Sequence, residues 1–297
     1  MGAECGTMSG MRMQWVAVSA GALLGLGCGR HDETPDPQTP QEMYELVQKL
    51  LQPNSEHDAS DFGQAMVWLR RAAEGGLLQA QTDLGGIYLQ GGKGGVKPDG
   101  KEAYHWFERA AEQGSAEAHF YLGLILQSGL DMPKDEAKGM EHWQYAAEHG
   151  VAEAQLALGR SMVARGEAAE GVRWLVQAAS APVPAVAAQA ACALGNVYAK
   201  GRDGVPQDMA EAARWYELAA RGGDASAQLV YALMLLQPEE SPLAEDREQG
   251  MRFLRMAAGQ DYPQAIAVLV NVLRNRVGGD EAEREAEAWS ERLEMLR

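Results

Sequence analysis

Residues 65–99 decide the fold and read AMVWLRRAAEGGLLQAQTDLGGIYLQGGKGGVKPD. In this stretch the small residue Ala65 is followed after three positions by Trp68, and after four more by the pair Ala72-Ala73. Spacings of three and four place side chains on one face of an α-helix. The stretch therefore predicts a helix that closes with an alanine pair, which we call the Ala-Ala helix.

A second helix is indicated beyond Gly76, which stands where a helix ends on a left-handed residue. Ala80 lies four residues before Leu84, and Leu84 is followed directly by Gly85. A glycine inside a helix costs about 1 kcal/mol relative to alanine, so a recurring one indicates that a neighbouring helix passes too close for a side chain. We call this second element the Leu-Gly helix.

Both helices recur along the chain. The alanine pairs recur at intervals of 38, 36, 32, 41 and 38 residues, at Ala72-Ala73, Ala110-Ala111, Ala146-Ala147, Ala178-Ala179, Ala219-Ala220 and Ala257-Ala258. Leu-Gly pairs stand at Leu84-Gly85, Leu122-Gly123, Leu158-Gly159 and Leu194-Gly195. Self-similarity at this period indicates a stack of helix pairs, in which neighbours supply each other's core.

An aromatic register lies four residues before each alanine pair. We expect its residues to be the structural anchors of the repeats, namely Trp68, Trp106, Trp143, Trp174, Trp215 and Phe253, where Trp143 is displaced by one residue because His142 fills the register. Helix starts are marked by an aspartate with Glu or Gln three residues later, at Asp61, Asp99, Asp208 and Asp246.

This pattern resembles the Sel1-like repeat family, which is related to the tetratricopeptide repeats. The resemblance is close over residues 65–99, 103–135 and 212–229, and it extends over about residues 60–275. The third, fourth and sixth copies depart from the family pattern, and the fourth carries an inserted Pro182-Val183-Pro184. The resemblance implies an all-α fold, an α-solenoid of about six helix-turn-helix repeats, and protein–protein interaction as the default function.

The N-terminal residues are typical of a targeting signal. Residues 15–27 read WVAVSAGALLGLG, which is the length of a signal-peptide core and too short to span a bilayer. Gly25-Leu26-Gly27-Cys28 resembles the lipobox of bacterial lipoproteins, although Gly25 stands where that motif usually has Leu or Val. Residues 29–40, with three prolines and no apolar residue, are typical of an extended tether. We expect diacylation of Cys28; ordinary secretion with an incidental cysteine is the alternative.

The sequence thus predicts five segments. They are a signal peptide (1–27), the lipidated cysteine and a Pro-rich tether (28–40), an N-terminal capping helix and loop (41–60), the repeat array (61–275) and a C-terminal capping helix (276–297). The last helix is amphipathic, because Ala282, Ala286, Trp289 and Leu293 share one face. We expect the protein in the bacterial cell envelope, facing the periplasm, with its membrane of residence open.

Composition and motifs exclude several classes of function. The chain has 42 acidic and 26 basic residues, for a net charge of −16, which disfavours nucleic acid. It carries no metalloprotease, nucleophile-elbow or phosphate-loop motif, and no two histidines are spaced to share a metal on one helix. The sequence therefore predicts no enzyme, no cofactor, no metal, and contact with a membrane only through the lipid anchor.

One feature points to partner binding. Arg173, Arg214 and Arg252 stand immediately before the aromatic register in the last three copies. Stacked repeats would align them as a basic row for an acidic peptide, a carboxylate or an anionic polysaccharide, because guanidinium groups bind carboxylates as a fork. Ordinary ion pairing with the many glutamates is the alternative interpretation. Four more arginines follow the register by two or three residues: Arg70, Arg71, Arg109 and Arg255.

The sequence favours an envelope lipoprotein that serves as a scaffold or adaptor for an unidentified protein or peptide. Two alternatives stay open. One is an accessory role in exporting an anionic polysaccharide, and the other is hydrolysis of cell wall or β-lactams.

Overall fold

A computed structural model of the chain describes residues 37–51, 59–91, 96–237, 243 and 246–296. Within these residues the secondary structure is helical, apart from one isolated β-bridge between Arg202 and Val205. The expected all-α solenoid is confirmed. The chain divides between Gly139 and Met140 into two compact units.

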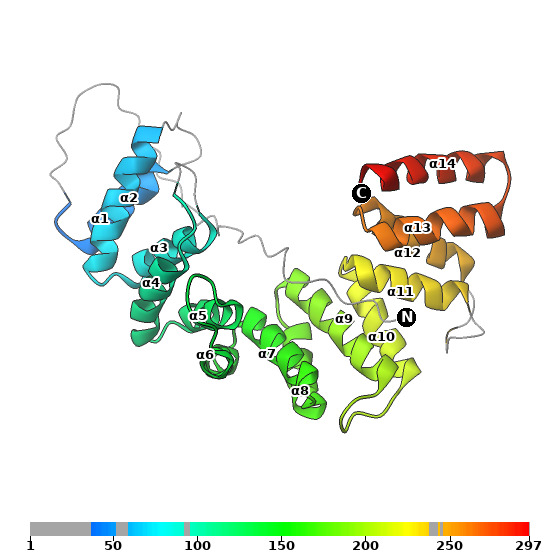
Figure 1. The fold of residues 1–297 in the computed structure, drawn as a ribbon, viewed down its shortest axis with the longest axis horizontal. Coiled ribbons are helices and arrows are strands. Elements are labelled where there is room, and N and C mark those ends of the chain that lie inside the picture. The colour runs from blue at the N-terminus through cyan, green and yellow to red at the C-terminus, as the bar shows by residue number, and fades with distance from the viewer. Residues whose placement is uncertain (1–36, 52–58, 92–95, 238–242, 244–245, 297) are drawn as a thin grey trace, which may run out of the picture. The chain divides into compact units, whose positions relative to one another are not determined.

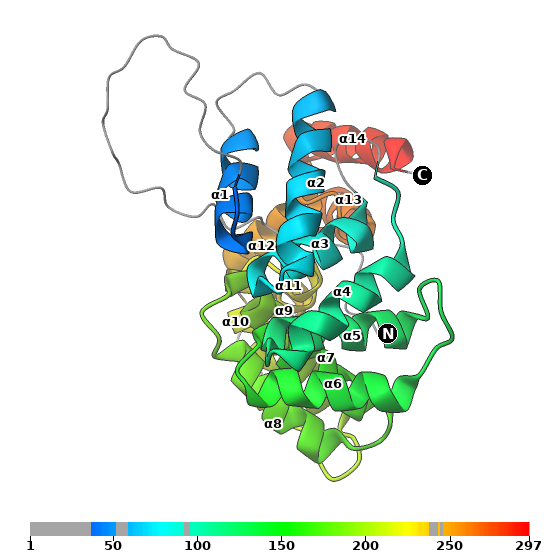
Figure 2. The same cartoon turned by 90° about the vertical axis from the view of Figure 1, so that its left-hand side faces the viewer.

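The N-terminal unit contains alternating Ala-Ala and Leu-Gly helices behind one leading helix (Figure 2). Its helices are α1 (Pro40–Leu50), α2 (Ala59–Glu74), α3 (Leu78–Gln90), α4 (Gly100–Glu112), α5 (Ala116–Ser128) and the first residues of α6 (Glu136–Glu148). From α1 to α5, each helix packs on the next one in the chain.

The C-terminal unit takes the rest of α6 and all later helices. They are α7 (Ala152–Ala164), α8 (Ala168–Ala179), α9 (Pro184–Lys200), α10 (Met209–Arg221), α11 (Ala225–Leu236), α12 (Arg247–Gly259), α13 (Pro263–Val272), the π-helical turn η2 (Leu273–Val277) and α14 (Asp280–Met295). From α7 to α14, each α-helix packs on the next one in the chain (Figure 1).

The recurring glycines of the Leu-Gly helices mark close approaches between helices, as predicted. A Cβ atom on Gly85 would lie 2.9 Å from the Phe107 ring of α4, and one on Gly195 would lie 2.7 Å from the Tyr216 ring of α10. Gly159 of α7 meets a Leu175 side-chain carbon of α8 at 2.8 Å in the same way. The Leu-Gly helices that carry Gly85 and Gly195 each pack more extensively on the Ala-Ala helix that follows than on the one before. The tight pair is therefore a Leu-Gly helix with the next Ala-Ala helix.

The alanine pairs form the closing turn of their helices. After Ala72-Ala73, the Gly76 N–H donates to the Ala73 carbonyl at 3.0 Å and the Leu77 N–H donates to the Ala72 carbonyl at 3.1 Å. This pair of hydrogen bonds requires a residue in the left-handed conformation, and the φ angle of Gly76 is +90°. The same positive φ recurs at Gly114, Gly150 and Gly223, which confirms the predicted helix ends.

Aspartates start the Ala-Ala helices in most repeats. The Asp99 carboxylate accepts hydrogen bonds from the N–H groups of Lys101 and Glu102, and Asp208 caps α10 in the same way. Asp246 caps α12 by accepting the N–H of Gln249. The prediction was wrong for Asp61, because α2 begins at Ala59 and places this residue inside the first turn. A carboxylate in the first turn still stabilises the helix, because it lies near the positive end of the helix dipole.

The helix α1 is fixed at both its start and its side. Thr39 and Glu42 form a reciprocal capping box at its N-terminus. The Tyr44 hydroxyl donates to the Asp83 carboxylate of α3 at 2.6 Å. Burial raises the pKa of the Asp83 carboxyl, although the hydrogen bond from Tyr44 acts in the opposite direction. The pKa of Tyr44 is also raised, by burial and by its hydrogen bond to Asp83.

The helix α14 covers the end of the C-terminal unit. Its predicted apolar face is confirmed, because Ala282 and Ala286 are buried in the core of this unit. Two forked ion pairs hold its flanks: Arg255 binds Glu285 at 2.8 and 2.9 Å, and Arg292 binds Asp261 at 2.7 and 2.8 Å. Their hydrogen bonds lower the pKa of Glu285 and of Asp261.

Candidate functional site

The three arginines of the predicted basic row lie on α8, α10 and α12, which are successive Ala-Ala helices of the C-terminal unit. Arg173, Arg214 and Arg252 are all exposed. Each stands two residues after the buried small residue of its helix, so it points away from the packed face. The structure therefore presents one arginine per repeat at a common register.

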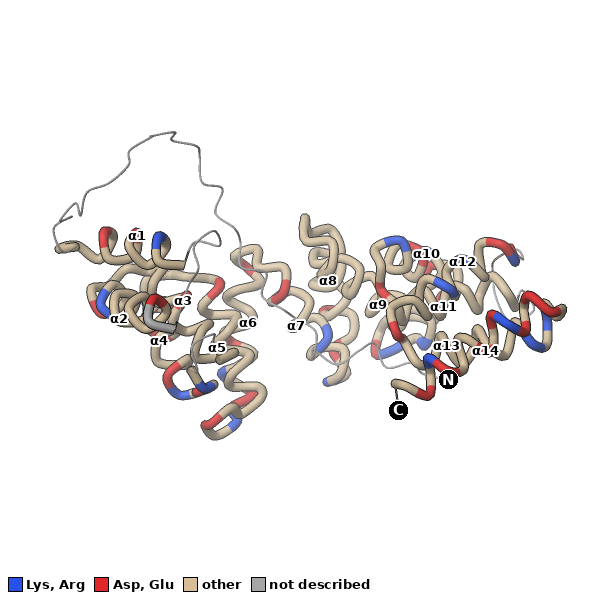
Figure 3. Tube along the Cα trace, turned by 90° about the horizontal axis from the view of Figure 1, so that it is seen from above, with Lys and Arg blue, Asp and Glu red and all other residues tan. Residues whose placement is uncertain are grey.

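These arginines differ in what they bind within the molecule. The Arg214 Nη1 atom lies 3.2 Å from Glu211 Oε2, and the Arg214 side chain keeps 79% of its surface exposed. Among the described residues, Arg173 and Arg252 take part in no ion pair. An exposed pair contributes at most about 1 kcal/mol, so Arg214 too can exchange its partner. Acidic residues lie near the basic ones on the helices of this unit (Figure 3).

Arg252 lines a surface depression of about 630 Å³ on α12. Arg255 and Met256 contribute to the same wall, with Asp246, Glu248 and Gln249. The Arg255 guanidinium is held by Glu285, and the Asp246 carboxylate accepts the Gln249 N–H as the helix cap. The Arg252 guanidinium is thus the cation in this depression that is available to a ligand.

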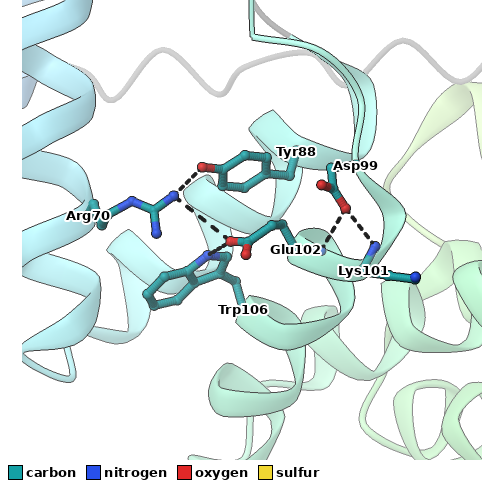
Figure 4. A network of polar contacts seen from close by, with 6 residues as sticks. All are labelled: Arg70, Tyr88, Asp99, Lys101, Glu102 and Trp106. Carbon is teal, nitrogen blue, oxygen red and sulfur yellow. Dashed lines mark hydrogen bonds and ion pairs between the residues drawn. The ribbon is translucent and has the colours of Figure 1, made fainter. Parts of the chain in front are cut away.

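The other arginines that follow the register are engaged inside the molecule. Figure 4 shows Arg70 of α2 pointing toward the side chains of Tyr88 on α3 and of Glu102 and Trp106 on α4. It donates to the Tyr88 hydroxyl, lies over the Trp106 ring at 6.0 Å and forms an ion pair with Glu102 at 3.9 Å. The Trp106 indole N–H donates to the same Glu102 carboxylate at 3.3 Å. This network joins the first two repeats.

Two further arginines stack on indole rings. Arg71 lies 4.8 Å from the Trp68 centroid and Arg109 lies 5.3 Å from the Trp106 centroid. Together with Arg70 and Arg255, they support the interpretation that most arginines of these helices stabilise the fold. The exceptions are in the basic row.

The main buried anchor differs from the predicted aromatic register. Of the predicted residues, Trp106, Trp143 and Phe253 are buried, whereas Trp68, Trp174 and Trp215 are half-buried. The residue after the register is buried in every repeat, at Leu69, Phe107, Trp143, Leu175, Tyr216 and Leu254. Three of these pack on the glycines of the Leu-Gly helices. Trp143 therefore stands at the later, buried position, and its displacement is not an irregularity.

The indole of Trp215 has an unusual environment. Its Nε1 atom is buried and has no acceptor among the described residues. Trp106 finds its acceptor in Glu102, four residues earlier, and the equivalent residue before Trp215 is Glu211. Glu211 is bound to Arg214 instead. Arg214 of the basic row thus binds the carboxylate that would correspond to the acceptor of the Trp106 indole.

A set of buried glutamines was missed by the sequence reasoning. Gln81, Gln155 and Gln228 are buried, and each donates from Nε2 to the carbonyl of the second alanine of the preceding pair, at 3.0, 3.2 and 3.1 Å. Gln228 also accepts from Gln260, the residue after α12, at 2.9 Å, and Gln81 accepts from Gln113, the residue after α4, at 2.7 Å. Their signal is an Ala-Gln dipeptide at the start of three Leu-Gly helices.

Three further features of the sequence concern the cysteines, a membrane-spanning helix and metal binding. Cys28 and the signal peptide lie outside the described residues, while Cys192 is buried and forms no disulfide within the described residues. No helix in the described ranges is long and apolar enough to cross a bilayer. Across those same ranges, His, Cys, Asp and Glu side chains nowhere gather in threes as a metal site would require.

The chain matches the model of the Sel1 repeat in five segments, at residues 58–77, 78–115, 116–151, 188–224 and 225–262. Each of the four longer matches begins at or within a Leu-Gly helix and ends after the next Ala-Ala helix. The order predicted from the sequence is an Ala-Ala helix followed by a Leu-Gly helix, so the family model divides the array half a repeat later. This phase agrees with the tighter helix pair. Residues 152–187, which the match omits, include the inserted prolines and still form α7 and α8.

Two solved structures share the fold. One is a protective antigen of uropathogenic Escherichia coli strains that displays an SLR fold, with 26% identity and a TM-score of 0.73 over 86% of this chain and 54% of that one. The other is a Sel1 repeat protein from Oxalobacter formigenes, with 25% identity and a TM-score of 0.69 over 84% of this chain and all of that one. The present chain spans about half the length of the Escherichia coli protein. No functionally curated protein matches it.

Sel1 repeat proteins are generally protein-interaction scaffolds, and those with this solenoid are typically non-catalytic. The matched segments cover more than half of the 297 residues, and the fold agrees with that of solved Sel1 repeat structures. The chain therefore belongs to the Sel1 repeat family.

Proposed function

We propose that this protein is a bacterial envelope lipoprotein that acts as an adaptor, and that its C-terminal unit holds a partner protein on α8, α10 and α12. The observation that carries the proposal is the row of exposed arginines at a common register, two of which have no ion-pair partner among the described residues. The scaffold role of Sel1 repeat proteins supports it. Guanidinium groups bind carboxylates through paired, charge-assisted hydrogen bonds, so the partner presents an acidic surface.

Cys28 supplies the membrane attachment in this proposal. Its support is the Gly25-Leu26-Gly27-Cys28 motif behind the apolar residues 15–27, and the Pro-rich residues that follow. Stable anchoring takes more than one acyl chain, and a diacylated cysteine satisfies that requirement. The tether would give the repeats freedom to reach a partner at the membrane surface.

Replacing Arg173, Arg214 and Arg252 together by alanine is expected to weaken partner capture from envelope extracts by at least about tenfold. A charge-assisted hydrogen bond contributes about 1.5–3 kcal/mol, which corresponds to about tenfold or more in affinity. The melting temperature should hardly change, because all three side chains are exposed. Capture is measured by affinity purification and mass spectrometry.

The matched control removes the same charge elsewhere on the C-terminal unit, by Lys200→Ala, Arg202→Ala and Arg284→Ala, all at exposed positions. Capture that survives in the row variant, or that falls equally in the control, contradicts the adaptor proposal. Recovery of uronate polymers in place of a protein would move the polysaccharide alternative ahead.

Substituting Cys28 by alanine in the full chain is expected to release the protein from the membrane fraction of a bacterial host. The native chain should incorporate a labelled fatty acid and the variant should not, because alanine has no thiol to which a diacylglyceryl group could be attached. Fractionation and gel fluorography measure both effects. Equal labelling of the two chains would refute the lipid anchor while leaving the adaptor surface untouched.

A further inference from the structure

Exposed apolar side chains accompany the basic row. Val176 on α8, Leu218 on α10 and Met256 on α12 are exposed by 37%, 49% and 41%. They follow Arg173, Arg214 and Arg252 by three, four and four residues. Residues at these spacings are neighbours on one helix face. Each of the three helices therefore presents a guanidinium group and, one turn later, a large apolar side chain.

This arrangement is confined to the C-terminal unit. In the N-terminal unit the same two positions hold Val67 and Arg71 on α2, and His105 and Arg109 on α4. There the order of charged and apolar residues is different, and both arginines already stack on indole rings of their own repeats. Their cations stabilise the fold, whereas Arg173 of α8 and Arg252 of α12 have no ion-pair partner among the described residues.

The depression on α12 shows what kind of side chain fits the surface. Arg252 and Met256 line it together, with the carboxylates of Asp246 and Glu248 at its edge. Asp246 is occupied as the cap of α12, and Arg255 is occupied by Glu285. A ligand therefore meets one available cation beside one apolar side chain, with Glu248 as a counter-charge.

We propose that α8, α10 and α12 form a docking surface for a peptide segment of a partner protein in which carboxylate and apolar side chains are neighbours. A purely anionic polymer would pair the arginines and leave Val176, Leu218 and Met256 in water. A purely apolar segment would cover guanidinium groups without satisfying them, which is costly. The acidic–apolar segment alone satisfies both groups of each helix. The inference rests on the proposed adaptor function and adds the specificity of its surface.

The test uses the purified full chain and two fluorescent peptides of equal length and charge, one built of Glu-Leu-Gly units and one of Glu-Ser-Gly units. Fluorescence anisotropy gives their affinities. The native protein is expected to bind the leucine peptide about tenfold more tightly, because its leucines leave water. The triple variant Val176→Ser, Leu218→Ser and Met256→Ser should lose this preference and keep its affinity for the serine peptide. Val277→Ser, which removes another exposed apolar side chain of the same unit, should change neither.

The arginine variant separates this inference from the proposed function. It is expected to lose affinity for both peptides. Equal binding of the two peptides by the native protein, or a preference that persists in the apolar variant, would overturn the acidic–apolar surface while the adaptor proposal stands. If the arginine variant binds both peptides as the native protein does, the basic row fails as the binding feature and both proposals fall. Tighter binding of a uronate polymer than of either peptide would also overturn the inference.

Discussion

Replacement of Gly195 by valine is expected to lower the free energy of unfolding of the C-terminal unit by about 3 kcal/mol. The reason is steric: a Cβ atom at this position lies 2.7 Å from two ring carbons of Tyr216, and α9 and α10 are the tight pair of their repeat. The ring cannot move away without opening the buried interface. Urea denaturation followed by circular dichroism measures the loss.

Gly259→Val is the matched control, since no atom lies within 4 Å of the position where its Cβ would stand and the residue is exposed. This variant should change stability by no more than about 0.5 kcal/mol. A second variant keeps the steric explanation testable. Tyr216→Leu combined with Gly195→Ala introduces the residues that stand at the corresponding positions of the next repeat, Ala232 and Leu254, and it should recover part of the stability that Gly195→Val loses. Equal destabilisation by both valine substitutions would show that close approach is not the cause.

The second large effect is expected on α8, where Leu175→Ala should destabilise the protein by about 2–5 kcal/mol. Leu175 is completely buried, packs in the core cluster around Leu194 and lies against Gly159. Trp174→Ala should cost less, although tryptophan is the larger residue, because its side chain is only half-buried. Thermal and urea unfolding of both variants give the comparison. A larger loss for Trp174→Ala would restore the aromatic register as the main anchor of the repeat.

The fold was largely predictable because its determinants are local. The alanine pairs, the glycines after them and the helix-starting aspartates each act within one or two turns of chain. Periodicity therefore indicated the repeats and most helix ends. Asp61 misled because an aspartate in the first turn and one at the cap look alike in sequence.

The pairing of helices was harder to predict, since it depends on which neighbour each helix packs against more closely. Adjacent positions such as Trp174 and Leu175 differ by only about 100° around a helix, and burial separates them only when the next helix is in place. The buried glutamines bind across repeats, and a single sequence does not show such distant partners.

For the candidate site, the sequence indicated the row of Arg173, Arg214 and Arg252 through its register alone. It could not tell them from Arg70, whose partners Tyr88 and Glu102 come from the following elements. Nor did it single out Leu218 and Met256, because an exposed apolar residue is recognised only after the packed face is known.

The size match between each Leu-Gly helix and the following Ala-Ala helix bears on how such arrays grow. Gly85 with Phe107, Gly159 with Leu175, and Gly195 with Tyr216 are pairs in which the space left by the glycine is occupied by the larger side chain. A duplication that copies both helices together carries its own complementary pair into the new location. A duplication that begins between the two helices separates the complementary residues and leaves a clash or a void. Descent by duplication is therefore expected to have preserved this two-helix cassette, with gains and losses of repeats falling at its outer boundaries.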